Sequence, residues 1–275
     1  VSDYGHPFAT LTIADLLGVP EADHPRFREV MPNALVGDIG SDPSKLGINP
    51  LAQIGTYFYA YIDERRREPR KDLLTDLAKA TYSDGTLPEI ANVVGIATFM
   101  FGAGQDTTTH LFTAMLRFLA EDPELQRKIR NERELISNFI EEVLRLEGAV
   151  KTDFRLSKVP VKVGHQDLPA GATVMMMING MNRDPRRFEN PHAFRLDRKN
   201  VRDHIAFARG IHTCPGAPLA RAEAKITLER LLDRTAEIRI DEARHGRAGR
   251  RRYQFLPSYA FRGLKELHLE FTPAA

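Results

Sequence analysis

The sequence predicts a mainly α-helical protein with a minor β-sheet region. Two long runs, residues 87–120 and 217–237, contain proline only in what would be their first turn, and such runs are typical of helices. Between them, valines alternate with other residues at 159–163, and a Leu-Pro-Ala-Gly turn follows at 168–171. This alternation before a turn and a further apolar run predicts a β-hairpin within residues 154–177. The length of 275 residues allows one large core or two small ones.

Composition excludes several classes of protein. The net charge of +2 is too small to indicate nucleic-acid binding. The sequence contains no uninterrupted apolar stretch of 18 residues, which argues against a membrane anchor within these residues. One cysteine excludes an internal disulfide, and residues 1–18 lack the order of a signal peptide, so we expect a reducing cytoplasm. Basic clusters at 65–71 and 244–252 are expected to be a solvated helix end and a loop.

The first part of the chain predicts three helices and a loop. Apolar residues at helical spacing indicate a short helix within residues 7–20, which ends at a glycine and a proline. Residues 36–50 are rich in Gly, Asp, Ser and Pro, which predicts a loop. A helical pattern then covers residues 51–67, and a shorter helix is expected over 71–80.

A helix of roughly 50 Å is predicted over residues 87–120. Its first half, residues 90–101, is almost wholly apolar, as expected of a helix buried on all sides. Polar residues 105–110 then follow Gly102-Ala103-Gly104. Glycine weakens a helix by about 1 kcal/mol relative to alanine, and a threonine hydroxyl can bond the carbonyl four residues earlier. We therefore expect a mid-helix groove with a carboxylate and a hydroxyl beside it; a helix contact through small residues is the alternative.

Two further helices, 124–130 and 135–146, precede the hairpin. On the second, Glu142 and Arg145 lie three residues apart and so share a face. Glu-x-x-Arg is a weak signal, because the chain contains it elsewhere. What distinguishes this pair is its position between the threonine-rich helix and the cysteine loop, with residues 194–198 following it. After the last helix, residues 255–271 predict two short strands.

Cys214 is the only cysteine in the chain. It directly precedes the helix expected from Ala217, where unpaired backbone N–H groups and the positive end of the helix dipole favour thiolate over thiol. Gly210 and Gly216 permit a tight turn in which the backbone can approach a flat ligand. For a lone cysteine, the alternative is a small buried hydrophobic residue.

Three motifs resemble those of the cytochromes P450. Residues 207–216, Phe-x-x-Gly-x-x-x-Cys-x-Gly, resemble the family's haem-binding loop, although Ala208 stands where bacterial members often have a second glycine, which should stiffen the loop slightly. Residues 103–108, Ala-Gly-x-Asp-Thr-Thr, resemble the oxygen-activation motif. Glu142 and Arg145 resemble the helix K pair, and Arg198 matches the arginine that joins it.

The resemblance implies roles for individual residues. Asp106 and Thr107 would be the catalytic acid and alcohol that relay protons to bound dioxygen. The implied haem-binding residues are Cys214 as the metal ligand, Phe207, Gly210, His212, Gly216, Arg155, Ala103 and Gly104, with Arg155 and His212 at the propionates. The implied structural residues are Glu142, Arg145 and Arg198. The implied substrate pocket contains Phe99, Met100, Val150, Phe154 and Tyr259, with Ser258 and Ala260 beside Tyr259.

The resemblance also implies the fold and the function. We expect a single P450 domain over residues 1–275, beginning near the family's helix E and lacking roughly the first third. It would be a bacterial haem-thiolate monooxygenase that contains haem b and inserts one oxygen atom from O2 into an apolar small molecule. A ferredoxin-type donor with its reductase would supply electrons, steered by Arg209, Arg221 and Lys225. Alternatives are a peroxygenase or isomerase, against which Asp106-Thr107 counts, and a truncated, impaired haem-binding or ligand-binding protein.

Overall fold

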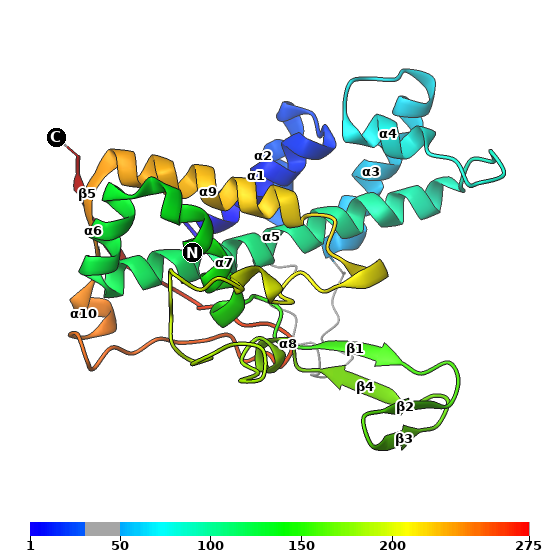
Figure 1. Cartoon of the computed structure of the whole chain (residues 1–275). Helices are drawn as coiled ribbons and strands as arrows, with labels where there is room; N and C mark the ends of the chain where they lie inside the picture. The colour runs from blue at the N-terminus through cyan, green and yellow to red at the C-terminus, as the bar shows by residue number, and fades with distance from the viewer. Residues whose placement is uncertain (31–49, 275) are drawn as a thin grey trace. The chain divides into compact units, whose positions relative to one another are not determined.

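The computed structural model describes residues 1–30 and 50–274, and the chain divides into two compact units, Val1–Thr109 and His110–Ala275 (Figure 1). Helices make up most of the first unit and contain more residues than the strands do in the second, where the strands described lie. The predicted class, mainly α-helical with a minor β region, is therefore confirmed. Residues 36–49 of the predicted loop lie outside the described residues, and the single domain over residues 1–275 stays a prediction.

The first unit is helical in the described residues. Its elements are α1 (Gly5–Leu17), a 3-10 turn (Glu21–Asp23), α2 (His24–Val30), α3 (Pro50–Arg67), α4 (Leu73–Lys79) and the first part of α5 (Ile90–Glu121). Phe27, Phe58 and Phe101 meet in the core with ring centroids 5.0 to 6.0 Å apart. This aromatic contact joins α2, α3 and α5, and gives the unit a packed centre.

Arg65 corrects the expectation that the basic cluster at 65–71 is a solvated helix end. Its guanidinium is buried, with Nε 2.8 Å from Asp72 Oδ2 and Nη2 3.0 Å from the carbonyl oxygen of Gly18. Asp72 also caps α4 by accepting the N–H of Thr75. Gly18 has a φ of 94°, and a Cβ there would lie 2.4 Å from Asp72. Arg65 is thus internal because two segments outside its own helix accept hydrogen bonds from it.

The second unit combines helices with short strands. After the end of α5 it contains α6 (Pro123–Asn131), α7 (Ile136–Glu147), β1 (Asp153–Leu156), β2 (Val161–Val163), β3 (Gln166–Leu168), β4 (Thr173–Met176), α8 (Ile178–Met181), α9 (Ala217–Arg234), β5 (Thr235–Ile240), α10 (Glu242–His245) and β6 (Leu269–Pro273). The buried side of α7 carries Phe139, Ile140 and Val143, as its apolar stripe predicts. Helix α9 packs against it.

The predicted hairpin is two nested antiparallel pairs. β1 pairs with β4, and β2 pairs with β3 at the far end of the same extension (Figure 1). The prediction placed the turn at 168–171, whereas the tight turn between β2 and β3 contains Gly164, with a φ of 60°. Since this turn returns the chain at once, Val161–Val163 pair with Gln166–Leu168 and not with the run after Gly171.

The C-terminal region also differs from the prediction. Helix α9 ends at Arg234, three residues before the predicted end, because Thr235–Ile240 continue as β5 and pair with β6. Of the two strands expected within 255–271, only the last residues belong to β6. The remainder forms isolated bridges, Phe255 with Leu264 and Phe261 with Val150.

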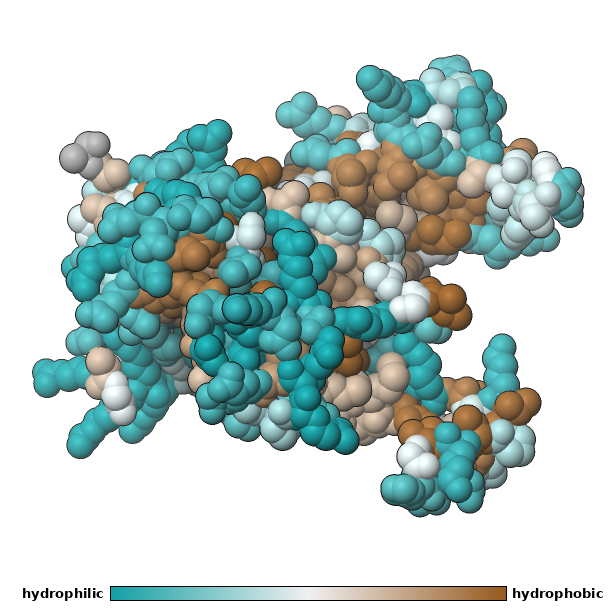
Figure 2. All heavy atoms as spheres, viewed as in Figure 1, coloured by the Kyte–Doolittle hydropathy of each residue, from teal (hydrophilic) through white to brown (hydrophobic). Residues whose placement is uncertain are grey.

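Helix α5 is not buried on all sides in its first half. Val93, Ala97 and Phe101 are buried, but Ile96 and Phe99 are 49% and 70% exposed. Figure 2 shows apolar side chains gathered at the surface of the first unit, and others on the extension that carries the nested pairs. Within the described residues, no helix combines the length and the apolar character needed to cross a membrane.

Candidate functional site

The loop around Cys214 is held by backbone hydrogen bonds. The amide of Cys214 donates to the carbonyl oxygen of Phe207 at 2.9 Å, and the amide of Thr213 donates to that of Gly210 at 3.0 Å. Cys214 is neither fully buried nor fully exposed. The alternative of a fully buried hydrophobic cysteine therefore does not describe this residue, which is partly exposed at the end of an ordered loop.

Two residues in this loop have left-handed backbone conformations. Gly210 has a φ of 70° and Ala208 has a φ of 56°. Glycine adopts this conformation freely, whereas for a residue with a side chain it costs of order 1 kcal/mol and persists only where the surroundings impose it. Ala208 therefore does more than stiffen the loop, since its conformation has to be held in place.

Helix α9 begins three residues after Cys214. The amide of Ala217 donates to the carbonyl oxygen of Cys214 at 3.3 Å, and Pro218 occupies the first turn, as predicted. A Cβ added to Gly216 would lie 3.7 Å from Cys214 Sγ. Glycine at this position thus leaves that side of the sulfur open, which suits a flat group lying against it.

Arg155 and His212 lie near the same carboxylate. Arg155 Nη1 donates to Asp153 Oδ2 at 2.6 Å on strand β1. Burial raises the pKa of Asp153, but hydrogen bonds from Arg155 and the amide of Phe154, with the charges of Arg155 and His212, lower it overall. His212 therefore acts on the carboxylate that Arg155 binds. Two potential cationic donors converge there, a suitable arrangement for a further carboxylate from a ligand.

Thr107 bonds back along α5 in the predicted way. Its hydroxyl donates to the carbonyl oxygen of Ala103 at 2.8 Å, one turn earlier. Helix α5 is nevertheless continuous through residues 102–108, so the expected groove is not a break in the helix. A Cβ on Gly104 would lie 3.4 Å from Ile13, which makes Gly104 a packing contact with α1.

Asp106 is a mostly buried carboxylate beside a histidine. Burial raises the pKa of Asp106 to about 6. His6 Nδ1 lies 3.7 Å from Asp106 Oδ1, and burial lowers the pKa of His6, so the imidazole is neutral near pH 7 and leaves the carboxylate charge uncompensated. The acid can thus exchange a proton close to neutral pH.

One face of α5 is accessible and mainly apolar. Ile96, Phe99, Ala103 and Thr107 follow one another at three- or four-residue spacing, and none of them is buried. Phe99 and Ala103 were singled out from the sequence, with the half-buried Met100 next to them, but Ile96 was missed. Its spacing of three and seven residues from Phe99 and Ala103 could have identified it.

The remaining predicted pocket residues lie in the second unit. Phe154 and Tyr259 are 40% and 50% exposed, and their rings meet edge to face with centroids 6.1 Å apart. Val150 forms a bridge with Phe261, and the amides of Lys151 and Thr152 donate to the carbonyl oxygen of Ala260. Val150, Phe154 and Tyr259 are therefore held close together, with Ser258 and Ala260 in the same backbone contact.

Glu142, Arg145 and Arg198 form one buried ion cluster. Both Glu142 oxygens lie 2.8 Å from Arg145 nitrogens, and Arg198 Nε lies 3.0 and 3.1 Å from them. The two guanidinium groups also donate to the carbonyl oxygens of Asn182, Glu189, Asn190, Pro191 and Ala193. The cluster thus fastens the irregular segment 182–198 to α7.

A second buried carboxylate, Glu141, was missed in the sequence. It contacts His204 at 2.8 Å and Arg221 at 2.6 and 3.0 Å. Arg221 had been expected to be a free charge near the loop, whereas this contact neutralises it. The signal was the pair of adjacent glutamates on a helix whose neighbouring positions are apolar.

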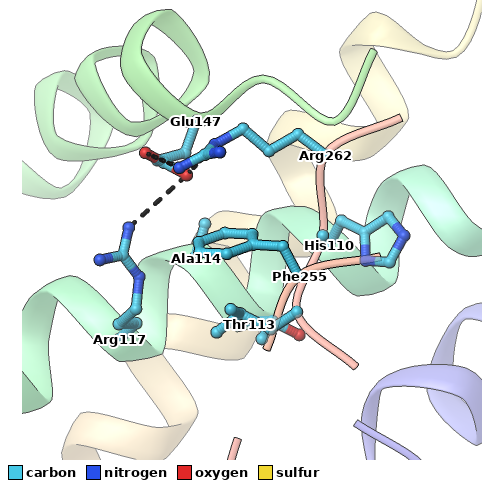
Figure 3. Close-up of a pocket in the computed structure, with 9 residues that line it drawn as sticks. His110, Thr113, Ala114, Arg117, Glu147, Phe255 and Arg262 are labelled. Carbon is cyan, nitrogen blue, oxygen red and sulfur yellow. Dashed lines mark hydrogen bonds and ion pairs between the residues drawn. The ribbon is translucent and has the colours of Figure 1, made fainter. Parts of the chain in front are cut away.

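Another ion cluster lies at the C-terminal half of α5 (Figure 3). Glu147 lies between Arg262, at 2.6 and 3.1 Å, and Arg117, at 3.6 Å. The cavity beside them, of about 10 Å³, is large enough for a single water molecule. Gly263 packs so tightly on the ring of His110 that a Cβ would lie 2.1 Å from its Nδ1. The cluster thus anchors residues 255–264 to α5 and α7.

The donor set fits a haem and does not fit a bare metal ion. Within residues 1–30 and 50–274, no three His, Cys, Asp or Glu side chains are grouped to hold a metal. Haem iron needs only one protein ligand on its proximal side, because the porphyrin supplies four nitrogens. Cys214 can supply that ligand, and Arg155 with His212 can meet acidic substituents.

Comparisons with known proteins agree on one family. A family model described as Cytochrome P450 matches residues 51–236. Cytochrome P450 monooxygenase PikC of Streptomyces venezuelae is 34% identical over 236 residues, which are 86% of this chain and 56% of that protein. Cytochrome P450 109 of Bacillus spizizenii is 31% identical over 280 residues, 99% of this chain and 67% of that protein. The chain thus spans between about half and two thirds of the length of these relatives.

Solved structures give the same result. The substrate-free form of Mycobacterium marinum cytochrome P450 CYP150A6 is similar with a TM-score of 0.90 and 54% identity, over 100% of this chain and 64% of that one. CYP109E1 from Bacillus megaterium in complex with corticosterone is similar with a TM-score of 0.85 and 33% identity, over 97% of this chain and 70% of that one.

Proposed function

The chain belongs to the cytochrome P450 family, and from this premise we propose that it is a haem-thiolate monooxygenase that inserts one oxygen atom from O2 into an apolar small molecule. The observation that carries the proposal is the loop of Cys214. The only cysteine of the chain is partly exposed in an ordered turn directly before α9, and Gly216 places no side chain against the sulfur. That environment suits an axial thiolate ligand.

Haem b would be held by three side chains of the second unit. Cys214 would supply the thiolate, while Arg155 and His212 would meet the propionates, and Arg155 would donate to Asp153 as well. When bound, the haem supplies the oxygen chemistry, and its thiolate ligand favours O–O cleavage. The reducing cytoplasm that keeps a lone thiol free is the compartment we propose.

Asp106 and Thr107 would deliver the protons that the reaction consumes. Asp106, with its pKa raised to about 6 by burial, can both accept and release a proton near neutral pH. The Thr107 hydroxyl already donates to Ala103, so its oxygen is oriented on the accessible face of α5 and can accept a bond from water. This acid and alcohol pair favours a monooxygenase over a peroxygenase or isomerase.

The substrate class follows from the accessible apolar residues. Ile96 and Phe99 on α5, and Phe154 and Tyr259 in the second unit, offer mainly hydrocarbon surface. The similar CYP109E1 structure holds corticosterone, a largely apolar molecule. Electrons would come singly from a ferredoxin-type donor with its reductase.

The test is the absorption spectrum of the haem-loaded, reduced protein with carbon monoxide. We expect the far-red-shifted Soret band of thiolate ligation, and its loss in Cys214→Ser, while Thr213→Ser should retain it because the neighbouring backbone is unchanged. A histidine-type spectrum would overturn the proposal. A folded chain that takes up no haem would instead support the alternative of an impaired ligand-binding protein.

A further inference from the structure

Glu141 is a buried carboxylate with charged partners from two distant segments. Its side chain is 2% exposed, and it accepts hydrogen bonds from Arg221 Nε and Nη2 on α9 and from His204 Nε2. Arg202 Nε lies 3.8 Å away. Burial raises the pKa of Glu141, but the bonds from His204 and Arg221 outweigh it and lower the pKa to about 2. Glu141 is therefore charged at any ordinary pH.

His204 has a defined tautomer. Its Nδ1 atom accepts the amide proton of Ala206 at 3.1 Å, so the ring proton is on Nε2, which donates to Glu141 at 2.8 Å. The ring is buried and lies with its centroid 6.2 Å from that of Phe207.

Arg221 reaches the same aromatic ring from α9. Its guanidinium carbon lies 4.7 Å from the centroid of Phe207, within the range of a cation–π contact. Glu141 holds this guanidinium through two parallel hydrogen bonds, which fix its plane as well as its position. Phe207 is thus contacted by two side chains that Glu141 orients.

Phe207 connects this network to the thiol loop. Its carbonyl oxygen accepts the amide proton of Cys214 at 2.9 Å, and the next residue is Ala208, with its left-handed φ of 56°. A strained alanine persists only where its neighbours hold the backbone. The contacts on Phe207 supply such a hold immediately before the strained residue.

Neighbouring carboxylates on α7 thus serve different parts of the chain. Consecutive helix residues point about 100° apart, so Glu142 reaches Arg198 and the segment before it, while Glu141 reaches α9 and His204, three residues before Phe207. We propose that Glu141 is a positioning residue for Cys214, which acts through Arg221, His204 and Phe207 to fix the sulfur for iron ligation. This inference rests on the proposed haem-thiolate function.

The expected effect is on the fraction of haem iron that Cys214 binds as a thiolate, and not only on the stability of the fold. Glu141→Gln keeps the shape but removes the charge that holds Arg221, and Arg221→Gln removes the partner at a half-exposed position that the fold tolerates more readily. In both, the haem-loaded, reduced protein with carbon monoxide should show a several-fold larger share of adduct without the red-shifted Soret band. Arg221→Lys should restore only part of the wild-type share, because lysine cannot bind in two parallel bonds.

Two control variants separate positioning from instability. Glu229→Gln removes a surface carboxylate on α9, the helix of Arg221. Glu229 lies 3.9 Å from Lys225, and its replacement should leave the spectrum unchanged. Gly263→Ala should lower stability by crowding His110 without contacting the loop, and should also retain the wild-type spectrum per folded molecule. If Glu141→Gln does not fold, Arg221→Gln gives the same comparison.

The possible outcomes distinguish a failure of this inference from a failure of the proposed haem-thiolate function. A wild type without the red-shifted band would overturn the proposed function and this inference with it. A wild type with the band, but with Glu141→Gln or Arg221→Gln showing the same share, would overturn the inference alone. A spectrum altered equally in Gly263→Ala would also overturn it, since general instability would then account for the change.

Discussion

The Nδ1 atom of His6 lies 3.7 Å from the Oδ1 atom of Asp106, so the acid proposed to deliver protons has a titratable neighbour on α1. The two groups respond to burial in opposite ways. Burial raises the pKa of Asp106 to about 6 and lowers the pKa of His6, so both are driven toward their neutral forms. The contributions of Asp106 and His6 to the free energy of unfolding should therefore change in opposite directions as the pH rises.

We predict that Asp106→Asn changes the pH dependence of stability between pH 4 and 6. The folded protein binds the Asp106 proton more tightly than the unfolded chain does, so Asp106 stabilises the fold at low pH and loses this contribution as the pH rises through about 6. Since one pKa unit corresponds to 1.36 kcal/mol, the loss is at most about 3 kcal/mol. Asp106→Asn should gain stability relative to wild type over that range.

Urea unfolding of both proteins at several pH values measures this difference. The lowered pKa of His6 contributes the opposite slope, with stability gained as the pH rises toward 6.5, and it is common to both proteins. Subtracting one curve from the other therefore isolates Asp106. Parallel curves from pH 4 to 7 would show that Asp106 keeps an ordinary pKa and is not a near-neutral acid.

Thr107→Ala should divert electrons from product to peroxide. The variant loses the hydroxyl on the accessible face of α5 and its hydrogen bond to Ala103, but no ion pair. Haem and substrate binding should therefore persist. Because a positioned proton donor commonly contributes about 10²-fold or more, product formed per electron consumed should fall at least several-fold. Peroxide and product are measured together during reduction.

Thr107→Ser is the matched control for this prediction, since it keeps the hydroxyl and loses only a methyl group. It should stay within about two-fold of wild type if the hydroxyl is what matters. Unchanged coupling in both Thr107→Ala and Asp106→Asn would mean that protons reach the site by another route.

The sequence predicted elements more reliably than contacts between distant segments. Helices α1, α3, α4 and α5 were predicted from apolar spacing and from glycine or proline near their ends, whereas α2, over His24–Val30, was missed. The nested strand pairs were predicted wrongly because Gly164 made a shorter turn than the one at 168–171. Local turn geometry, which pattern alone does not determine, set the register there.

The buried ion clusters also show that contacts between distant segments are hard to predict from the sequence. Glu142 and Arg145 share a helix face, so their contact follows from spacing, and Arg198 was added only through a family resemblance. Glu141, His204 and Arg221 are separated by 63 and 17 positions, and no periodicity relates them. Only packing brings them together. Roles at a haem likewise stay predictions until a loaded protein is measured.

We expect Gly263→Ala to destabilise the protein. A Cβ at this position would lie 2.1 to 2.5 Å from three atoms of the ring of His110, a buried residue that lines the pocket of Figure 3. Overpacking of this kind costs about 1–3 kcal/mol, and the melting temperature should fall by several degrees. Gly95→Ala on α5 is the control, because nothing lies within 4 Å of its Cβ, and alanine favours the helix by about 1 kcal/mol. An unchanged melting temperature in Gly263→Ala would mean that His110 moves aside.

The last prediction concerns the electron donor. Of the three cations near Cys214, Arg221 is bound to Glu141, and Lys225 lies 3.9 Å from Glu229. Arg209 is exposed, and its guanidinium donates only to the backbone oxygen of Asp203 among the hydrogen bonds described for it. Next to Gly210 stands Ile211, which is 98% exposed, so an exposed charge and an apolar side chain adjoin the loop.

An acidic donor would be steered to this loop mainly by Arg209. Steering acts on the association rate and its salt dependence, so Arg209→Glu should slow the first electron transfer several-fold at low salt and flatten its dependence on ionic strength. Lys225→Glu should have a smaller effect, since Glu229 already offsets that charge, and Arg239→Glu, on β5, serves as the control for net charge. Stopped-flow reduction at several salt concentrations gives the slopes. If all three variants share the slope of the wild type, the donor docks on another surface, because a charge reversal at the docking site has to change the long-range attraction that the slope reports.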